Sequence, residues 1–253
     1  MSTSVLITGA GTGFGRGAAV ELARRGHPVI ATTVSQAEAV ELAAAQPELK
    51  TAKLDITDPD DRRQVADWRV DVLVNNAGLG QVGPLRSIPL DRVRRIFETN
   101  VFGTLAMTQA VVPQMFERGS GRILILSSVA GVAAGPMTGP YSMTKHALQA
   151  MGSAMRAELA PAGIDVALVN PGPFATGFND RMIDDPGEWF DRDTARPEEL
   201  RLLEGARQRI TANQLDPAEV VLVIADLVEA GETQLVNFVP PDMLARMGLD
   251  KRH

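Results

Sequence analysis

Short apolar segments alternate with longer amphipathic ones along almost the whole chain of 253 residues, and this alternation restricts the possible folds more than any other feature. The short segments are rich in β-branched and aliphatic residues and are apolar on both faces, which is typical of strands buried in a parallel sheet. We predict strands at residues 4–8, 28–33, 51–55, 71–75, 122–127, 164–169 and 234–239.

The longer segments have apolar residues three and four positions apart, which is the spacing of a helix that packs on one side. They cover residues 13–25, 35–45, 59–68, 89–116, 141–161 and 217–230. Asp58 before Pro59 and Asp216 before Pro217 place a capping carboxylate ahead of a proline, so two helix starts are well marked. A repeated strand-then-helix order predicts an α/β fold, a Rossmann-type doubly wound parallel sheet of seven strands with helices on both faces.

Nothing in the sequence divides the chain, because it contains no repeat and no linker rich in glycine, serine or proline. We therefore predict one domain over residues 1–253. Residues 173–215 interrupt the alternation, since they are polar and irregular yet carry Phe174, Met182 and Trp189. Apolar side chains on an irregular insertion indicate a lid over a binding site, and a packed surface excursion is the alternative.

The composition excludes several classes of site. The absence of cysteine removes disulfides, thiolate metal sites and cysteine nucleophiles, and together with an N-terminal sequence that contains no export signal it favours the cytoplasm. A formal net charge of −6 argues against nucleic acid or an anionic membrane as a partner and leaves a small-molecule substrate. No metal site is predicted, because His27, His146 and His253 form no ligand pattern.

The loop after the first predicted strand is rich in glycine and leads directly into an amphipathic helix. It reads Thr8-Gly9-Ala10-Gly11-Thr12-Gly13-Phe14-Gly15. Glycines allow the backbone to approach a ligand closely, and free N–H groups at a helix start favour an anion. The loop therefore predicts a phosphate-binding site, with a bare tight turn as the alternative. Phe14 breaks the G-x-G-x-x-G pattern, and the loop follows T-G-x-x-x-G-x-G instead.

The only tyrosine of the chain, Tyr141, is followed four positions later by Lys145, so the two side chains share a face of the predicted helix. A phenol with a pKa of about 10 is a poor base at neutral pH, and a nearby ammonium group lowers that pKa. Ser128 ends the fifth predicted strand, where a hydroxyl faces the crevice that binds ligands in open α/β sheets. These residues predict acid–base chemistry, although each motif alone has a structural alternative.

Taken together, the T-G-x-x-x-G-x-G loop, the Tyr-x-x-x-Lys pair, Ser128 and Asn100 resemble the short-chain dehydrogenase/reductase family over about residues 4–239. The resemblance implies an oxidoreductase that interconverts alcohols and carbonyl compounds with NAD or NADP. It implies that Tyr141 is the general acid/base and that Ser128 holds the substrate oxygen. Lys145 would lower the tyrosine pKa and bind the nicotinamide ribose, and Asn100 would anchor a water linked to Lys145.

The resemblance also implies which residues surround the dinucleotide. They belong to the glycine loop, to the ends of later strands, to the N-N-A-G motif at residues 75–78 and to a P-G-x-x-x-T motif. The predicted cofactor-binding residues are Thr8, Gly9, Gly11, Thr12, Gly13, Phe14, Gly15, Thr33, Asp55, Ile56, Asn76, Ala77, Gly78, Tyr141, Lys145, Pro171, Gly172, Phe174 and Thr176.

The end of the second predicted strand distinguishes NAD from NADP in this family. Thr33 occupies the place of the acid that contacts the ribose hydroxyls of NAD, and no arginine follows it. The lack of a repelling carboxylate, with the hydroxyls of Thr33 and Ser35 and with Arg16 nearby, favours NADP.

The expected pocket, at residues 80–84, 129–138 and 182–190 with Phe174, is mostly apolar and favours a secondary alcohol or ketone on an apolar, cyclic or aromatic skeleton. The weakly charged helices at residues 104–116 and 147–159 predict a homodimer or homotetramer. Two other functions stay open, a non-catalytic dinucleotide-binding regulatory protein and an epimerase or dehydratase of the related extended family.

Overall fold

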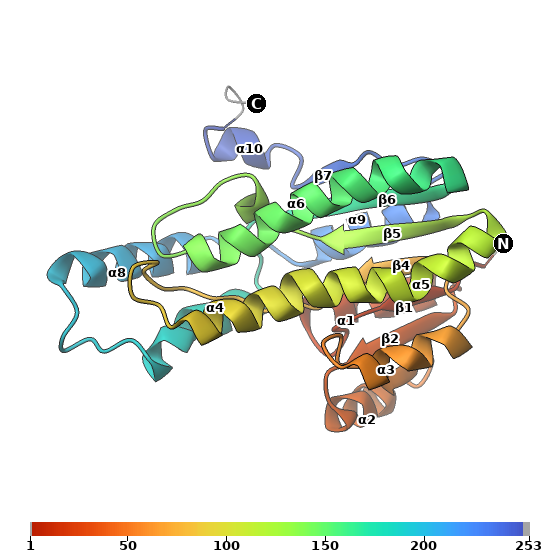
Figure 1. Cartoon of the computed structure of the whole chain (residues 1–253), viewed down its shortest axis with the longest axis horizontal. Helices are drawn as coiled ribbons and strands as arrows, with labels where there is room; N and C mark the ends of the chain where they lie inside the picture. Colours follow the sequence, from red (N-terminus) through yellow and green to blue (C-terminus); the bar gives the residue numbers. More distant parts are fainter. Residues whose placement is uncertain (1, 250–253) are drawn as a thin grey trace.

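In the computed structural model, which describes residues 2–249, helices cover both faces of a parallel sheet (Figure 1). The strands lie in the order β3-β2-β1-β4-β5-β6-β7, and every neighbouring pair is parallel. The predicted doubly wound α/β fold is confirmed. The strands are β1 (Val5–Ile7), β2 (Val29–Thr33), β3 (Lys50–Lys53), β4 (Val72–Asn75), β5 (Gly121–Leu126), β6 (Ile164–Pro171) and β7 (Val236–Val239).

The strand order reverses at β1, which has β2 on one side and β4 on the other. The connections that follow β1 and β4 lead to helices on opposite faces of the sheet, so a crevice forms at its carboxyl edge. In Figure 1 the arrowhead of β5 points toward the end of the molecule that carries the helix α8 (Pro197–Thr211), and the N terminus lies at the opposite end. The topology therefore places a ligand site between the strand ends and the segment that contains α8.

Two buried clusters fix the helices to the two faces of the sheet. Residues of α1 (Gly13–Arg24), α2 (Gln36–Ala45) and α9 (Ala218–Glu229) pack on one face, and residues of α5 (Thr104–Arg118) and α6 (Gly139–Leu159) pack on the other. Along β1, Val5 and Ile7 belong to the first cluster and Leu6 to the second, as the alternation of a strand requires. None of the helices in residues 2–249 has both the length and the apolar character needed to cross a membrane.

The predicted helices at residues 59–68 and 89–116 are interrupted. The first consists of α3 (Pro59–Arg63) and a 3-10 turn (Gln64–Asp67), whereas α4 (Leu90–Phe97) joins α5 through a π-helical turn (Glu98–Gly103). A side chain on Gly103 would meet Ile56 at 2.8 Å, so this turn lies unusually close to the loop after β3. Such turns frequently mark functional sites, and this one contains the buried Asn100.

Residues 173–215, which we call the lid, are more regular than the sequence indicated. They contain α7 (Phe178–Asp184), a 3-10 turn (Asp185–Glu188) and α8, so the expectation of an irregular segment was wrong. The sequence hid these helices because α7 is short and α8 is mostly polar, with Leu203 and Ala206 as its buried apolar residues. These two residues join Met182 and Ile183 in a third buried cluster, which packs the lid against the body.

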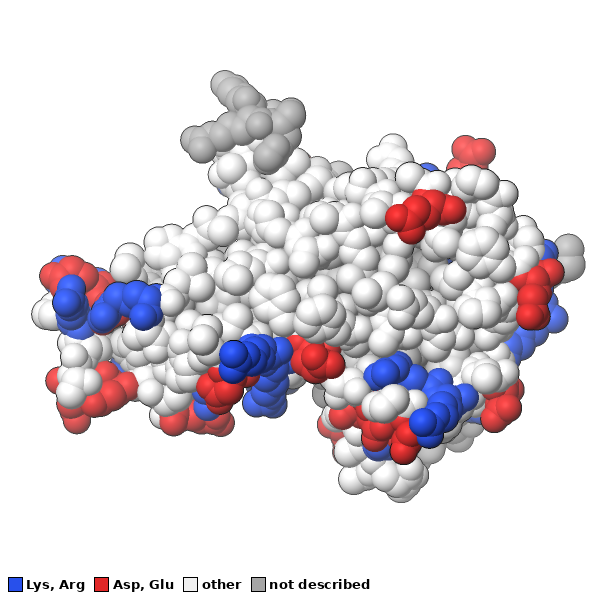
Figure 2. Space-filling model, viewed as in Figure 1, with Lys and Arg blue, Asp and Glu red and all other residues white. Residues whose placement is uncertain are grey.

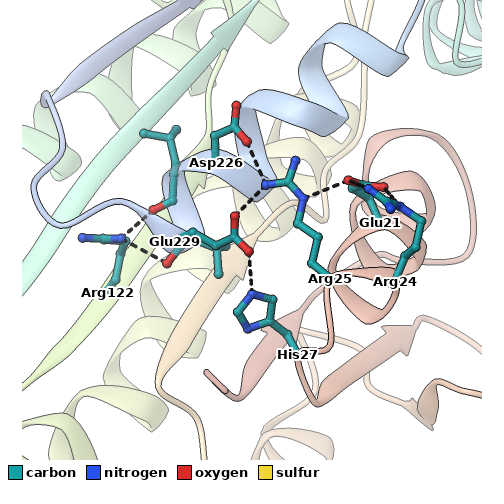
Figure 3. A network of polar contacts seen from close by, with 9 residues as sticks. Glu21, Arg24, Arg25, His27, Arg122, Asp226 and Glu229 are labelled. Atoms are coloured by element: carbon teal, nitrogen blue, oxygen red, sulfur yellow. Dashed lines mark hydrogen bonds and ion pairs between the residues drawn. The ribbon is translucent and has the colours of Figure 1, made fainter. Parts of the chain in front are cut away.

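A network of charged groups ties α1 to α9 (Figure 3). The guanidinium of Arg25 lies 2.8 Å from Glu21, 2.8 Å from Asp226 and 2.7 Å from Glu229. His27 contacts Glu229 at 3.0 Å, and Arg24 together with Arg25 lowers the pKa of Glu21 to about 2. The network lies at the C-terminal ends of both helices, so it leaves the N-terminal end of α1 free to face the crevice.

Candidate active site

A cleft of about 1110 Å³ lies at the carboxyl edge of the sheet, bordered by the loops after β1, β4 and β5 and by the lid. It brings together most of the residues that the sequence singled out. Three of the four predicted catalytic residues line it, and the exception is Asn100. The predicted cofactor residues that line it are Gly9, Gly11, Thr12, Gly13, Phe14, Thr33, Asp55, Ile56, Asn76, Ala77, Gly78, Tyr141, Lys145, Pro171, Gly172, Phe174 and Thr176.

The glycine loop packs tightly against the loop after β4. Gly9 has a φ of +64°, and a Cβ atom at this position would lie 2.8 Å from the Cα atom of Ala77. A Cβ atom on Gly15 would lie 2.6 Å from the carbonyl oxygen of Gly9. Larger residues would therefore push the two loops apart. Thr12, the N-cap of α1, makes no side-chain cap, so the helix presents an uncapped N terminus to the cleft.

Thr8 and Gly15 shape the cleft from behind and do not line it, which corrects their predicted contact with the cofactor. The buried hydroxyl of Thr8 accepts the N–H groups of Asn76 and Ala77, both at 3.1 Å. The side-chain amide of Asn76 donates in turn to the carbonyl oxygens of Thr8 and Gly9 at 2.9 Å. These four bonds hold the glycine loop and the N-N-A-G loop in one arrangement.

Tyr141 and Lys145 project from the first turns of α6 into the cleft, next to Ser128 at the end of β5. The ammonium of Lys145 lies 5.5 Å from the centre of the Tyr141 ring and donates to the carbonyl oxygen of Leu126 at 2.7 Å. Ser127 is turned toward α6, because its hydroxyl accepts from Gln149 at 2.8 Å. The alternation along the strand thus leaves the hydroxyl of Ser128 beside Tyr141.

Burial shifts the pKa values of the two α6 residues in opposite directions. It raises the pKa of Tyr141 well above the ordinary value, and a hydrogen bond with Ser128 offsets part of this shift. Burial lowers the pKa of Lys145 to about 7. The phenol therefore keeps its proton at neutral pH, which suits a proton donor. Because Lys145 loses its charge near neutral pH, it favours the phenolate most strongly below pH 7.

Asn100 lies next to this group but is fully engaged in holding it. Its side-chain oxygen accepts the N–H of Leu79 at 2.7 Å, and its amide nitrogen donates to the carbonyl oxygen of Leu79 at 2.8 Å and to the hydroxyl of Thr144 at 3.0 Å. Both amide hydrogens are used, so the side chain connects the β4 loop to α6 and has a positioning role. The predicted water-anchoring role of Asn100 stays a prediction.

Sequence reasoning missed Glu38, which lines the cleft beside Thr33. Its carboxylate lies 3.9 Å from the position of a Cβ atom on Gly11, and the methyl group of Thr33 lies 3.5 Å from the same point. The sequence indicated that no carboxylate lies here, and the position of Glu38 shows that this expectation was wrong. Ser35 accepts the N–H of Glu38 at 3.2 Å, and the Ser-x-x-Glu pattern of a helix start was the signal that could have placed Glu38 in the first turn of α2. Arg16, which we expected near the cofactor, does not line the cleft.

The lid borders the other end of the cleft with the apolar side chains of Phe178 and Met182 and with polar ones that include Asn179, Arg181 and Asp184. The rings of Phe178 and Tyr141 lie 5.8 Å apart, and Met182 packs with Val82 and Met137. Asp185 fixes this part of the lid, because it accepts from Arg92 of α4 at 2.7 Å and from the indole of Trp189 at 3.0 Å. The cleft next to Tyr141 is therefore lined by both apolar and polar side chains, and residues 129–138, which the sequence placed in the pocket, do not line it.

Comparison with known proteins agrees with this geometry. The family model for the short chain dehydrogenases matches residues 3–187. Human 17-beta-hydroxysteroid dehydrogenase type 1 is 34% identical over 266 residues, which covers 98% of this chain and 81% of the relative. This chain belongs to the short-chain dehydrogenase/reductase family.

Solved structures of the family superpose on nearly the whole chain. A short-chain dehydrogenase from Streptomyces avermitilis has a TM-score of 0.84 and 31% sequence identity, and the match covers 99% of this chain and 93% of that one. A short-chain dehydrogenase from Burkholderia cenocepacia J2315, solved in complex with NADP, has a TM-score of 0.77 and 25% identity, with 99% and 94% covered. The chain is therefore an oxidoreductase of the kind that acts on CH–OH or C=O groups.

The residues of this chain fit a nicotinamide dinucleotide. Gly9 and Gly13 line the cleft with positive φ angles and leave no room for side chains, and the uncapped N terminus of α1 suits a diphosphate. The cleft continues past Asp55 and Ile56 at one end and reaches Tyr141 at the other. Phe14, at the place of the third glycine, packs edge-on against Phe174 at 5.6 Å, which explains why an aromatic residue is accommodated there.

The shifted pKa of Lys145 predicts a pH-dependent stability that Lys145→Met should remove. Because the folded state releases the lysine proton near pH 7, the unfolded state binds more protons between about pH 7 and pH 10.5, and the free energy of unfolding of the wild type rises across this window. We expect the variant to lose stability relative to the wild type as the pH increases from 7 to 10, measured by urea unfolding.

Lys53→Met is the control for this experiment. Asp61 raises the pKa of Lys53, so removal of Lys53 cannot produce the same trend. Parallel stability curves for the wild type and Lys145→Met between pH 7 and pH 10 would contradict the assignment.

Proposed function

We propose that this protein interconverts a secondary alcohol and a ketone on an apolar skeleton, with NAD(P) as the hydride carrier. The observation that carries the proposal is the placement of Tyr141 in the cleft beside Ser128 and Lys145, with Phe178 and Met182 of the lid lining the same cleft. A nicotinamide supplies or accepts the hydride when it is bound. The protein has to orient the substrate oxygen, exclude water and move one proton.

Each residue has a separate part in the proton transfer. The hydroxyl of Ser128 orients the carbonyl oxygen toward Tyr141, whose phenol is protonated at neutral pH and donates its proton as the alcohol forms. Lys145 stabilises the resulting phenolate when its own amino group is protonated, and the protonated fraction falls as the pH rises through about 7. In the opposite direction Tyr141 must first lose its proton, so oxidation should accelerate as the pH rises, while reduction should be faster near and below pH 7.

The apolar character of the substrate is supported by the compartment under the lid. Phe178 and Met182 line it, and Met182 packs on the buried Val82 and Met137. A Cβ atom on Gly80 would lie 2.7 Å from Met182, so the loop after β4 accepts the lid without a gap. The human relative is named for 17-beta-hydroxysteroids, and such a compound is a secondary alcohol on a polycyclic apolar skeleton. We propose substrates of this general class in preference to sugars and polyanionic compounds.

Tyr141→Phe tests the reaction, because it removes the proton donor and keeps the ring packed against Phe178. We expect kcat for reduction of an apolar cyclic ketone to fall by about 100-fold or more, as for loss of a general acid. The dissociation constant of the nicotinamide cofactor, measured by fluorescence titration, should stay within about twofold of the wild-type value. Unchanged turnover would refute the role of Tyr141, and a wild type that binds cofactor but turns over no substrate would favour a regulatory protein.

For the cofactor we propose a preference for NAD(H), which reverses the expectation drawn from the sequence. The carboxylate of Glu38 lies where the ribose of the adenosine half would pass, next to Gly11 and Thr33. A carboxylate accepts hydrogen bonds from ribose hydroxyls but repels a 2′-phosphate. The Burkholderia cenocepacia relative was solved with NADP, so this preference is proposed for the present chain alone.

Glu38→Gln tests the preference by removing the charge with little change in shape. We expect kcat/KM with NADPH to rise at least about tenfold relative to kcat/KM with NADH, because the repulsion is worth roughly 1.4 kcal/mol or more. Glu41→Gln is the control, since Glu41 is exposed on the same helix but does not line the cleft. An unchanged cofactor ratio in Glu38→Gln would contradict the proposal.

We also propose that the protein forms a homodimer or a larger homo-oligomer through the face covered by α5 and α6. This face carries few charged side chains (Figure 2). Phe102 is 54% exposed, Phe116 50% and Met143 45%, so this weakly charged face offers several large apolar side chains that a partner chain could cover.

Sedimentation velocity tests the oligomer. We expect a mass of at least two chains for the wild type and a shift toward the monomer in Phe116→Glu. Leu222→Glu is the control, because Leu222 is similarly exposed, at 47%, but lies on α9, on the other face of the sheet. A monomeric wild type at micromolar concentration would contradict the proposal.

A further inference from the structure

Arg181 is a cation of the lid that lines the cleft without an ionic partner. It lies on α7, its side chain is exposed, and within residues 2–249 it forms no ion pair with a carboxylate. The arginines that hold the lid to the body behave differently. Arg92 pairs with Asp185 and Glu188, and Arg86 pairs with Glu199. Arg181 is thus not part of the contacts that fix the lid, and its charge is available to a ligand.

The backbone places this charge close to the N terminus of α1. The Nη1 atom of Arg181 folds back toward Gly177 and lies 3.2 Å from the position of a Cβ atom on that residue. Gly177 follows Thr176, whose Cβ atom lies 3.3 Å from the Cβ position of Gly13, the first residue of α1. The chain of contacts from Gly13 through Thr176 and Gly177 brings the guanidinium to the same part of the cleft as the glycine loop.

An arginine next to an uncapped helix N terminus is a strong combination for a phosphate group. The helix offers N–H donors and a partial positive charge, and a guanidinium adds donors of matching geometry and a full charge. Of the carboxylates that line the same cleft, Asp184 lies on α7 itself and forms no ion pair with Arg181, and Glu188 pairs with Arg92. Asp185 is occupied by Arg92 and Trp189, and Glu38 lies at the ribose side, near Gly11.

We propose that Arg181 binds the diphosphate of the dinucleotide and so couples cofactor binding to closure of the lid. This inference rests on the proposed function, because it requires a dinucleotide in the cleft. The same helix carries Phe178 and Met182, which form part of the apolar substrate compartment. A diphosphate held by Arg181 therefore positions the side chains of α7 that face the substrate.

Binding of ADP-ribose and of adenosine separates the diphosphate contact from the rest of the site. Isothermal titration should show at least about tenfold weaker binding of ADP-ribose to Arg181→Ala than to the wild type, with partial recovery in Arg181→Lys. Binding of adenosine, which has no phosphate, should be unchanged. Arg192→Ala is the control, since Arg192 is an exposed lid residue that does not line the cleft, and it should bind both compounds as the wild type does.

Trp189 reports on the lid in the same experiment. The chain has two tryptophans, so Trp68→Phe leaves Trp189 as the remaining one. In the Trp68→Phe variant we expect ADP-ribose to change the fluorescence of Trp189. In the double variant that also carries Arg181→Ala, we expect no such change at saturating ADP-ribose.

The outcomes distinguish the two proposals. If the wild type binds ADP-ribose and Arg181→Ala binds it equally well, the role of Arg181 is overturned while the proposed function stands. Equal losses of ADP-ribose and adenosine binding would also overturn it, because they indicate a structural defect. A wild type that binds neither NADH nor ADP-ribose would overturn the proposed function, and the role of Arg181 with it.

Discussion

The parallel pairing of β1 with β4 and of β4 with β5 is the constraint on which the rest of the site depends. Because these strands run in one direction, the glycine loop, the N-N-A-G loop and Ser128 all emerge at one edge of the sheet. The hydroxyl of Thr8 and the amide of Asn76 then join the first two of these segments. Side chains that are far apart in the sequence are brought into one cleft by this edge, and the lid covers it.

Within the cleft, burial has opposite effects on neighbouring groups. Burial raises the pKa of Tyr141 and lowers the pKa of Lys145. The proposed transfer of a proton from this pair to a substrate oxygen depends on these shifts. Burying Lys145 costs stability, and its hydrogen bond to the carbonyl oxygen of Leu126 offsets part of this cost. Asn100 and Thr144 hold the β4 loop against α6, which keeps the distance between the catalytic groups and the glycine loop constant.

Much of this arrangement was predictable from the sequence, and the failures have physical reasons. Alternating apolar runs determine a parallel sheet, and the spacing of Tyr141 and Lys145 determines a shared helix face, since both depend on local periodicity. The π-helical turn that buries Asn100 depends on packing of Gly103 against Ile56, which no periodicity reveals. Glu38 was overlooked because its place beside Gly11 depends on the direction in which α2 runs after β2. The family motif at the end of β2 does not reveal that direction.

We propose that a hydride passes in this cleft between a nicotinamide and the carbinol carbon of an apolar secondary alcohol, while Tyr141 donates or accepts the proton. The most direct measurement is to supply NADH that carries deuterium at the transferable position of the nicotinamide, together with an apolar cyclic ketone, and to analyse the alcohol by mass spectrometry and NMR. We predict that the deuterium appears at the carbinol carbon in the wild type. Alcohol that forms without deuterium at this carbon, or no alcohol across a broad panel of apolar ketones with NADH or NADPH bound, would contradict the account.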